Sequence, residues 1–250
     1  METKTIIATE DLTKTYNGRA AVDRLSFSLG EGEVFGFLGP NGAGKTTTLL
    51  MLLGLTEPTS GRASVLGFDP TREPIEVKRM IGYLPENTGF YGDLNAWQSL
   101  RFVAELNGLP AEVAKQRIEE ALKTVNLIDE SRKKTSAYSR GMRQRLGIAE
   151  VLIKDPKLVF LDEPTLGLDP DATNRMIDLI ERLCREKKMT VLLSSHLLHL
   201  VQRICHRVGI MIRGRMVAQG SMEQLAQEKL GVGTEQYTLE EIYMKYFQEV

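Results

Sequence analysis

The sequence predicts an α/β fold that combines a mostly parallel sheet, an N-terminal antiparallel β part and an inserted α-helical subdomain. Three observations carry this prediction. Short apolar, β-branched runs alternate with helical patterns, which is typical of a parallel sheet covered by helices. Pairs of runs near the start and near the end of the chain have antiparallel features. From about Asn87 to Lys154 the helical period dominates, which indicates the inserted subdomain.

The individual elements follow from these patterns in order. Residues 33–38 form a buried strand that leads into a glycine-rich turn and a helix through about Leu55. Pro110 opens a helix in the inserted part, and two short helices are expected after Ser221. Arg213-Gly214 joins the last two strands as a hairpin. The expected strands are 6–12, 25–29, 33–38, 158–161, 190–194, 208–212 and 215–219. The expected domains are a core of residues 1–86 and 155–220, a helical subdomain of residues 87–154 and a helical tail of residues 221–250.

The composition is that of an ordinary globular protein, with 42% hydrophobic and 26% charged residues in a chain of 250. The net charge of -1 argues against broad nucleic-acid binding by bulk electrostatics, so no nucleic acid is expected as a partner. Cys184 and Cys205 show no metal-binding spacing and fit a reduced, cytosolic protein. The N-terminal segment lacks the apolar region of a signal peptide, and no apolar run approaches the roughly 18 residues of a membrane span. Contact with a membrane is therefore expected through a partner.

The strongest motif is the glycine-rich loop that follows the strand 33–38. It reads Gly39-Pro-Asn-Gly-Ala-Gly-Lys-Thr46 and matches G-x-x-x-x-G-K-[ST], the pattern of a P-loop NTPase. Glycines let the backbone wrap around phosphate oxygens, and backbone N–H groups point at the anion. Lys45 is expected to reach the β- and γ-phosphates, and the Thr46 hydroxyl to bind Mg²⁺. The residues expected to bind ATP here are Gly39, Pro40, Asn41, Gly42, Ala43, Gly44, Lys45, Thr46 and Thr47.

A pair of carboxylates follows the apolar strand 158–161. The strand carries Asp162 to its C-terminal end, where open α/β sheets place their ligands. Asp162 is expected to hold Mg²⁺ directly or through water. Glu163 is then placed to polarise the attacking water. Taken alone, two carboxylates could mark an ordinary strand end, and the glycine-rich loop is what favours the functional interpretation.

With these motifs in this order, the chain resembles the ATP-binding-cassette (ABC) ATPases over nearly its whole length. Tyr16 stands where that family places an aromatic residue that stacks on adenine. The string Ser139-Arg-Gly141-Met-Arg-Gln144 is similar to the ABC signature, with Arg140 at a position that is often glycine, and Ser139 is a plausible N-cap. The resemblance implies an ATP-sandwich dimer in which Ser139, Arg140 and Gly141 contact the ATP held by the opposite subunit.

The resemblance also assigns roles to three further residues. Asp169, in Leu166-Gly-Leu-Asp169, lies in the loop that crosses the dimer interface and is expected to contact the opposite ATP. His196 matches the switch histidine, which binds the γ-phosphate and steadies the water, so that Lys45, Glu163 and His196 form the catalytic set. Glu86 replaces the usual Gln of the loop that senses magnesium, where its carboxylate can still coordinate the metal. His199 and His206 match no motif and are expected on helix faces.

The form Tyr-Leu-Pro-Glu86 and the string Tyr138-Ser-Arg-Gly-Met are similar to those in ATPases of type-2 ABC exporters. The resemblance therefore implies ATP hydrolysis with Mg²⁺, a second ATPase subunit and a separate integral membrane permease, with the chain held peripherally at the cytoplasmic face of the membrane. The second subunit is expected to be an identical chain, with a related chain as the alternative. Phe90, Tyr91 and Leu94 either line a groove for the permease or pack in the core. The alternatives that stay open are an importer motor and a soluble ABC ATPase that acts on ribosomes or DNA.

Overall fold

The computed structural model describes residues 4–230 and 238–248. The chain divides into two compact units, of which the first comprises Met1–Arg79 with Leu183–Val250 and the second comprises Met80–Arg182. This division reflects contacts within the chain. It does not test the subdomain boundaries expected from the sequence, which stay a prediction. The tail expected over 221–250 lies partly outside the described residues, at 231–237 and 249–250.

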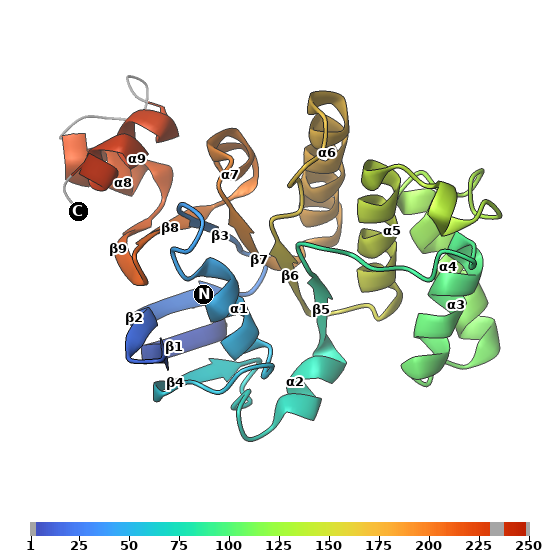
Figure 1. Cartoon of the computed structure of the whole chain (residues 1–250), viewed down its shortest axis with the longest axis horizontal. Coiled ribbons are helices and arrows are strands. Elements are labelled where there is room, and N and C mark those ends of the chain that lie inside the picture. The colour runs from blue at the N-terminus through green and yellow to red at the C-terminus, as the bar shows by residue number, and fades with distance from the viewer. Residues whose placement is uncertain (1–3, 231–237, 249–250) are drawn as a thin grey trace. The chain divides into compact units, whose positions relative to one another are not determined.

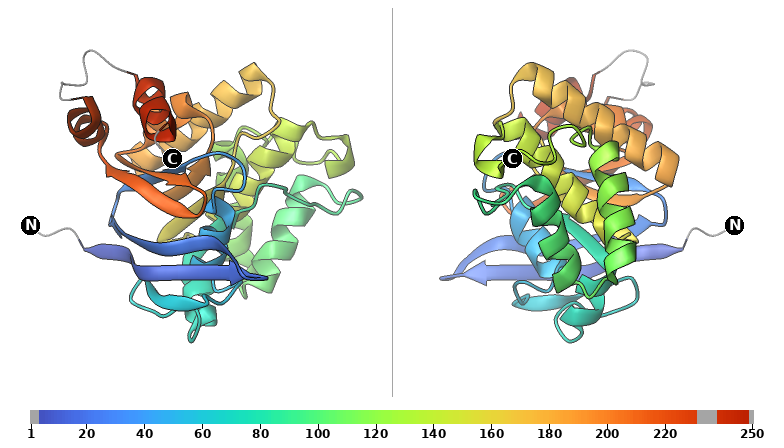
Figure 2. Two further views of the ribbon diagram at one scale, coloured as in Figure 1. Left: turned by 60° about the vertical axis from the view of Figure 1, so that its left-hand side comes forward. Right: turned by 90° about the vertical axis from the view of Figure 1, so that its right-hand side faces the viewer.

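The first unit contains an antiparallel sheet in which β1 (Thr5–Tyr16) lies between β2 (Arg19–Gly30) and β4 (Ser60–Val65). Figure 2 shows these strands side by side, with β1 and β2 as a long hairpin. Buried and exposed residues alternate along β2 from Leu25 to Leu29, because one face of this sheet packs inward. The antiparallel β part predicted from the sequence is therefore confirmed.

The same unit contains parallel strands. The wholly buried β3 (Val34–Leu38) pairs in parallel with β7 (Thr190–Ser195) and with β8 (Arg207–Ile212), and β8 pairs with the antiparallel β9 (Arg215–Gly220). These bounds agree with the predicted strands to within two residues. The continuous burial of β3 explains its unbroken apolar sequence, since a central parallel strand is covered on both faces.

Three phenylalanines join the two sheets of the first unit. Phe27 of β2 packs against Phe35 and Phe37 of β3, with ring centroids 5.0 to 5.4 Å apart. All three side chains are buried. Burying one such side chain stabilises a fold by about 2 to 3 kcal/mol, so this cluster contributes strongly to the core of the first unit.

Helices complete both units. The helix after the glycine-rich loop, α1, ends at Leu52, earlier than the sequence suggested, and two helices follow Ser221 as predicted. The helices outside the inserted part are α1 (Lys45–Leu52), α2 (Pro74–Met80), α6 (Pro170–Lys187), α7 (Leu198–Ile204), α8 (Met222–Leu230) and α9 (Leu239–Gln248).

The second unit is mostly helical around two parallel strands, β5 (Ile81–Leu84) and β6 (Leu158–Asp162). Asn95 and Gln98 form a reciprocal capping box that starts α3, because each side chain accepts the other's backbone N–H. In Figure 1, α3, α4 and α5 lie beside one another. The helices here are α3 (Ala96–Leu106), α4 (Ala111–Thr124), the 3-10 turn η1 (Thr135–Ala137) and α5 (Arg140–Ile153). The helical character expected for this region is confirmed.

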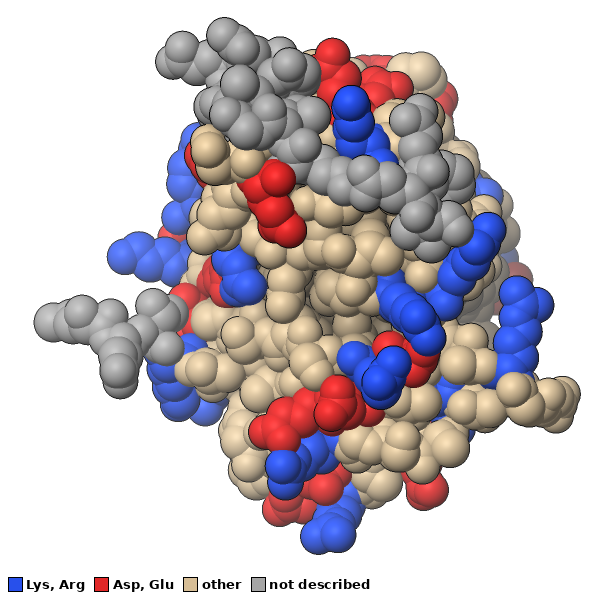
Figure 3. All heavy atoms as spheres, turned by 90° about the vertical axis from the view of Figure 1, so that its left-hand side faces the viewer, with Lys and Arg blue, Asp and Glu red and all other residues tan. Residues whose placement is uncertain are grey.

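Charged side chains of both signs lie on the surface of the protein. On the face drawn in Figure 3, Lys and Arg side chains lie among Asp and Glu side chains, as the small net charge leads one to expect. Within residues 4–230 and 238–248, no helix has both the length and the apolar character required to cross a membrane.

Candidate nucleotide-binding site

The glycine-rich loop, residues 39–47, connects the buried β3 to α1 in the first unit. Gly42 and Gly44 have φ angles of 79° and 103°, a left-handed region that favours glycine. A Cβ atom at Gly42 would meet nothing within 4 Å, so the loop is open on that side. A Cβ atom at Gly44 would lie 2.5 Å from the Ala21 carbonyl oxygen, and one at Gly39 would lie 2.3 Å from that of Met211. The loop is thus open on one side and tightly supported on the other.

Lys45 spans this loop. Its side chain is buried, and its Nζ donates to the Gly39 carbonyl at 2.6 Å and to the Pro40 carbonyl at 3.3 Å. The ammonium group therefore lies over the start of the loop although the residue itself begins α1. A cation held at this place, beside an open loop and a helix N-terminus, is suited to bind an anion such as a phosphate chain.

Tyr16 lies at the tip of the β1–β2 hairpin, next to the turn formed by Asn17 and Gly18. Both turn residues have positive φ angles, 48° and 77°, as a two-residue hairpin turn requires. Tyr16 is 48% exposed. Lys14 Nζ lies 5.0 Å from the centroid of its ring and donates to the Glu57 carbonyl at 2.6 Å. Lys14 thus occupies one face of the ring as a cation–π partner. Stacking of adenine on Tyr16 stays a prediction.

His196 leaves the same sheet edge as the glycine-rich loop. In the parallel β3–β7 pair, Leu38 is opposite Ser195. Gly39 and His196 therefore directly follow the ends of two neighbouring strands. His196 is exposed there. The expectation for His206 was wrong: it lies after α7, not on a helix face, and its Nδ1 accepts the Val34 N–H at 2.9 Å.

The carboxylates lie together in the second unit. β5 and β6 pair in parallel with Leu84 opposite Leu161, so the chain segments carrying Glu86 and Asp162 leave the same sheet edge. Asp162 is buried and Glu86 is partly buried. Burial above all, with the charges of Asp162 and Glu86, raises the pKa of Tyr83 to about 12. The phenol therefore stays neutral beside these two carboxylates at physiological pH.

Glu163 has an unusual backbone conformation. Its φ angle is 47°, a left-handed region that costs a non-glycine residue about 1 to 3 kcal/mol. The side chain is nevertheless buried, and the backbone carbonyl of Glu163 accepts the Leu166 N–H at 3.0 Å. Such a conformation persists only where the surrounding structure enforces it, and it is frequent at functional sites.

Ser139 caps α5 as predicted. Its Oγ accepts the Met142 N–H at 3.2 Å, and Ser139 and Arg140 are both exposed at the start of the helix. The helix is anchored behind them, since a Cβ atom at Gly147 would lie 2.5 Å from Leu84 Cδ1 and 2.9 Å from Thr88 Cγ2. Helix α5 and the segment on either side of Glu86 are therefore in close contact within the second unit.

Arg140 and Gly141 also contact the segment that leads to Asp169. The guanidinium of Arg140 lies over Gly167, where an added Cβ atom would be 2.6 Å from Cζ and 2.7 Å from Nη1. A Cβ atom at Gly141 would be 3.2 Å from that of Ala172. Asp169 Oδ1 accepts the Ala172 N–H at 2.8 Å and so caps α6. A contact of these residues with a partner's nucleotide stays a prediction.

Two features of the site were not predicted from the sequence. The position of Lys14 over Tyr16 could have been predicted from their spacing, since residues i and i+2 of a strand share one face. The contact of Gly214 with the glycine-rich loop, at 3.0 Å from its N–H to the Ala43 carbonyl, could not, because 171 positions (214 − 43) separate the two residues.

The side-chain oxygens expected to bind Mg²⁺ are of the kind that this ion prefers, and the magnesium site itself stays a prediction. Among the residues the structure describes, no cluster of three or more His, Cys, Asp or Glu side chains could hold a metal. Magnesium usually binds through one or two protein oxygens together with substrate phosphates, so it needs no such cluster. Thr46 is an exposed residue in the first turn of α1 of the first unit, and Asp162 ends β6 of the second unit with a carboxylate.

Comparison with known proteins identifies the family. The family model described as "ABC transporter" matches residues 22–166. The chain is 42% identical over 221 residues to the bacitracin transport ATP-binding protein BcrA of Bacillus licheniformis, which covers 88% of this chain and 71% of BcrA. A solved ATP binding subunit of an ABC transporter superimposes with a TM-score of 0.86 at 29% identity, covering 97% of this chain and 100% of that one. A dimeric, post-hydrolysis state of the cassette MJ0796 bound to ADP and Pi gives a TM-score of 0.78 at 23% identity, over 86% of this chain and 98% of that one, which shows a shared fold.

The predicted fold class, a P-loop NTPase core with an antiparallel β part and a helical insert, is therefore confirmed. The family match covers more than half of the chain, and the region aligned with BcrA covers most of both proteins. This chain belongs to the ABC transporter family, as one of its ATP-binding and ATP-hydrolysing subunits.

Proposed function

We propose that two copies of this chain form an ATP-sandwich dimer that drives export through a separate membrane permease, to which they bind at the cytoplasmic face of the membrane. The observation that carries the dimer is the exposed start of α5, where the capping Ser139 and the next residue, Arg140, are both exposed. A helix N-terminus that presents N–H groups and a hydroxyl is suited to an anion supplied from outside the subunit. The dimeric assembly of MJ0796 supports the same arrangement.

The roles of the residues follow from their chemistry. Residues 39–47 bind the triphosphate, Lys45 neutralises its β- and γ-phosphates, and Tyr16 stacks on the adenine. Glu163 orients the attacking water or accepts its proton, and His196 steadies that water beside the γ-phosphate. Ser139, Arg140, Gly141 and Asp169 contact the ATP of the opposite subunit.

Mg²⁺ is proposed to be held by Thr46 and Asp162, with Glu86 as a further oxygen ligand. When bound, the ion neutralises charge on the phosphate oxygens. Glu86 adds a carboxylate where the family usually has an amide, next to the neutral Tyr83. The closed dimer binds ATP more tightly than the open one, and this difference lets ATP binding and hydrolysis drive the motion.

The permease is proposed to dock on an exposed apolar surface of the second unit, formed by Tyr91, Phe102 and Leu106. Their exposed fractions are 68%, 43% and 71%, and the rings of Tyr91 and Phe102 meet edge to face at 5.9 Å. Phe90 and Leu94 are partly buried beside them. Tyr91 of this surface lies shortly after Glu86 in the sequence. A movement of a permease helix bound here would therefore be transmitted to the loop that carries Glu86. The name of BcrA, a bacitracin transport protein, supports a transporter over a ribosome- or DNA-bound ATPase.

Co-purification tests the proposal. Tagged Glu163→Gln protein, purified in mild detergent with ATP from membranes of its native cells, is expected to retain a stoichiometric multi-span membrane protein in mass spectrometry. Adding Tyr91→Ala and Leu106→Ala is expected to lower this recovery, whereas Leu55→Ala is the matched control, since Leu55 is 54% exposed outside the surface. Recovery only from the soluble fraction, with ribosomal or DNA-bound proteins, would contradict the transporter proposal. A permease that takes up its cargo would make the chain an importer motor.

A Tyr16→Ala variant is expected to bind ATP about fivefold more weakly, because stacking on one aromatic ring contributes about 1 kcal/mol. Tyr16→Phe keeps the ring above Lys14 and is expected to bind like the wild type. Equilibrium binding of a fluorescent ATP analogue measures both. An unchanged affinity in the alanine variant would remove Tyr16 from the binding site.

A further inference from the structure

The turn between β8 and β9 is a tight two-residue hairpin turn. Arg213 and Gly214 have φ angles of 48° and 85°, and Ile212 pairs with Arg215 across the turn. Positive φ angles at both central residues define the turn type that matches the twist of antiparallel strands. A Cβ atom at Gly214 would lie 2.9 Å from the carbonyl oxygen of Ala21 in β2, so the turn rests directly on that strand.

The same turn holds the glycine-rich loop from behind. The Gly214 N–H donates to the Ala43 carbonyl at 3.0 Å. Gly39 packs on the Met211 carbonyl and Gly44 on the Ala21 carbonyl, at separations that leave no room for a Cβ atom. The loop backbone is therefore shaped by β2 and by the β8–β9 turn, and a shift of the turn would shift the loop.

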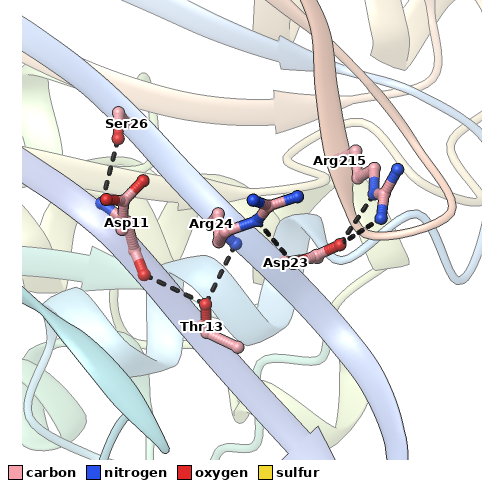
Figure 4. Close-up of polar contacts among 6 residues, drawn as sticks. All are labelled: Asp11, Thr13, Asp23, Arg24, Ser26 and Arg215. Atoms are coloured by element: carbon pink, nitrogen blue, oxygen red, sulfur yellow. Dashed lines mark hydrogen bonds and ion pairs between the residues drawn. The ribbon is translucent and has the colours of Figure 1, made fainter.

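Asp23 fastens the turn to β2 in two ways. Its backbone N–H donates to the Gly214 carbonyl at 2.8 Å, and its Oδ2 accepts from Arg215 Nε at 2.7 Å. Arg215 Nη2 lies 2.6 Å from the same oxygen, and Arg24 Nε lies 3.4 Å from Oδ1 (Figure 4). The Asp23 side chain is 22% exposed and Arg215 is 64% exposed. The hydrogen bond from Arg215, with the charges of both arginines, holds the pKa of Asp23 below its usual value, so the carboxylate stays ionised near neutral pH.

We propose that the Asp23–Arg215 pair is a positioning element for nucleotide binding. It fixes the β8–β9 turn on β2, and the Gly214 N–H of that turn fixes the Ala43 carbonyl, so the glycine-rich loop is held in the conformation that accepts phosphate. Neither residue of the pair belongs to the glycine-rich loop, residues 39–47. The inference rests on the proposed role of residues 39–47 in ATP binding.

The expected effect follows from the population of the competent loop. If a ligand binds one loop conformation, its apparent dissociation constant rises as the fraction of that conformation falls. An ion pair with an exposed arginine stabilises its geometry modestly, so breaking it is expected to raise the KM for ATP about threefold to fivefold. Saturating ATP restores the competent conformation, so kcat is expected to stay within about twofold of the wild type.

The test compares Arg215→Met and Asp23→Asn with Arg62→Met. Arg62 Nη2 lies 2.6 Å from Glu10 Oε2, in an ion pair between β4 and β1 of the same unit that is distant in sequence from the turn. Equilibrium binding of a fluorescent ATP analogue gives the affinity, and phosphate release gives KM and kcat. The Asp23 and Arg215 variants are expected to bind more weakly, Arg62→Met to match the wild type, and Arg215→Lys to recover part of the affinity. Hydrogen exchange at the Gly214 amide is expected to accelerate in Arg215→Met and in Asp23→Asn but not in Arg62→Met.

Each outcome decides the proposal. Wild-type affinity and wild-type exchange at Gly214 in both Arg215→Met and Asp23→Asn would overturn it. An equal loss of affinity in Arg62→Met would show a general effect of destabilisation and would also overturn it. If a single variant fails to fold, ATP affinity is measured instead on Arg215→Lys and on the charge-exchanged pair, Asp23→Arg with Arg215→Asp. Normal ATP binding by Lys45→Ala would instead contradict the assignment of the loop itself, so the two failures are distinguishable.

Discussion

Replacing Glu163 with Gln is expected to lower ATP turnover by about a thousandfold while leaving ATP affinity unchanged. Acid–base assistance by one positioned side chain contributes roughly 10² to 10⁴ in rate. Glutamine keeps the size of the buried side chain and the backbone geometry at φ 47° but loses the carboxylate charge. Phosphate release measures turnover, and equilibrium binding measures affinity. With ATP and Mg²⁺, light scattering is expected to show an accumulated dimer.

Glu150→Gln is the matched control for this experiment. Glu150 lies on α5 of the same unit, outside every motif, and burial raises the pKa of its carboxyl group. Removing this carboxylate is expected to leave turnover close to the wild-type rate. Near-normal hydrolysis by Glu163→Gln would assign the water-activating role to another group. A monomer at every ATP concentration would contradict the sandwich dimer.

Replacing Lys45 with Ala is expected to weaken ATP binding about a hundredfold. The Lys45 ammonium is buried and lies over the start of the glycine-rich loop, where it donates to the Gly39 carbonyl at 2.6 Å. A hydrogen bond to a charged partner contributes about 1.5 to 3 kcal/mol, and 2.7 kcal/mol corresponds to about a hundredfold in affinity. Equilibrium binding of a fluorescent ATP analogue gives the dissociation constant for each protein.

The first unit offers a matched lysine. Lys78 is partly buried, and its Nζ donates to the Gly54 carbonyl at 3.4 Å, so it shares with Lys45 a backbone carbonyl as acceptor. Lys78→Ala is expected to bind ATP with wild-type affinity. If both variants lost binding equally, the effect of Lys45→Ala would reflect a loss of folding, which thermal unfolding of the two proteins would reveal.

The elements that carry the site were predictable because their signals are local. A continuous apolar run reports a strand covered on both faces, and β3 and β6 lie where such runs occur. The N-cap at Ser139 and the hairpin turn at Arg213-Gly214 depend on residue types within a few positions. The order of motifs was sufficient to identify the family.

Contacts between distant segments were not predictable in this way. His206 was expected on a helix face, yet its Nδ1 accepts the N–H of Val34, which precedes it by 172 positions. The guanidinium of Arg140 lies over Gly167 of its own chain, a contact that the sequence did not predict. Its contact with a partner's nucleotide stays a prediction. These arrangements depend on which strands become neighbours, and residue patterns within one segment carry no information about that.

The sequence by itself determined the fold class, the strands that end at functional residues, and the motifs of an ABC ATPase, because each depends on local periodicity or on short-range residue chemistry. Only the tertiary structure decided why Gly39 and Gly44 must lack a side chain on the protein side, since the Met211 and Ala21 carbonyls occupy that space. It also decided that Asp23 meets Arg215, which lies 192 positions further along the chain. Strand pairing brings such residues together through backbone hydrogen bonds that any sequence can make, so their proximity is a property of the folded chain.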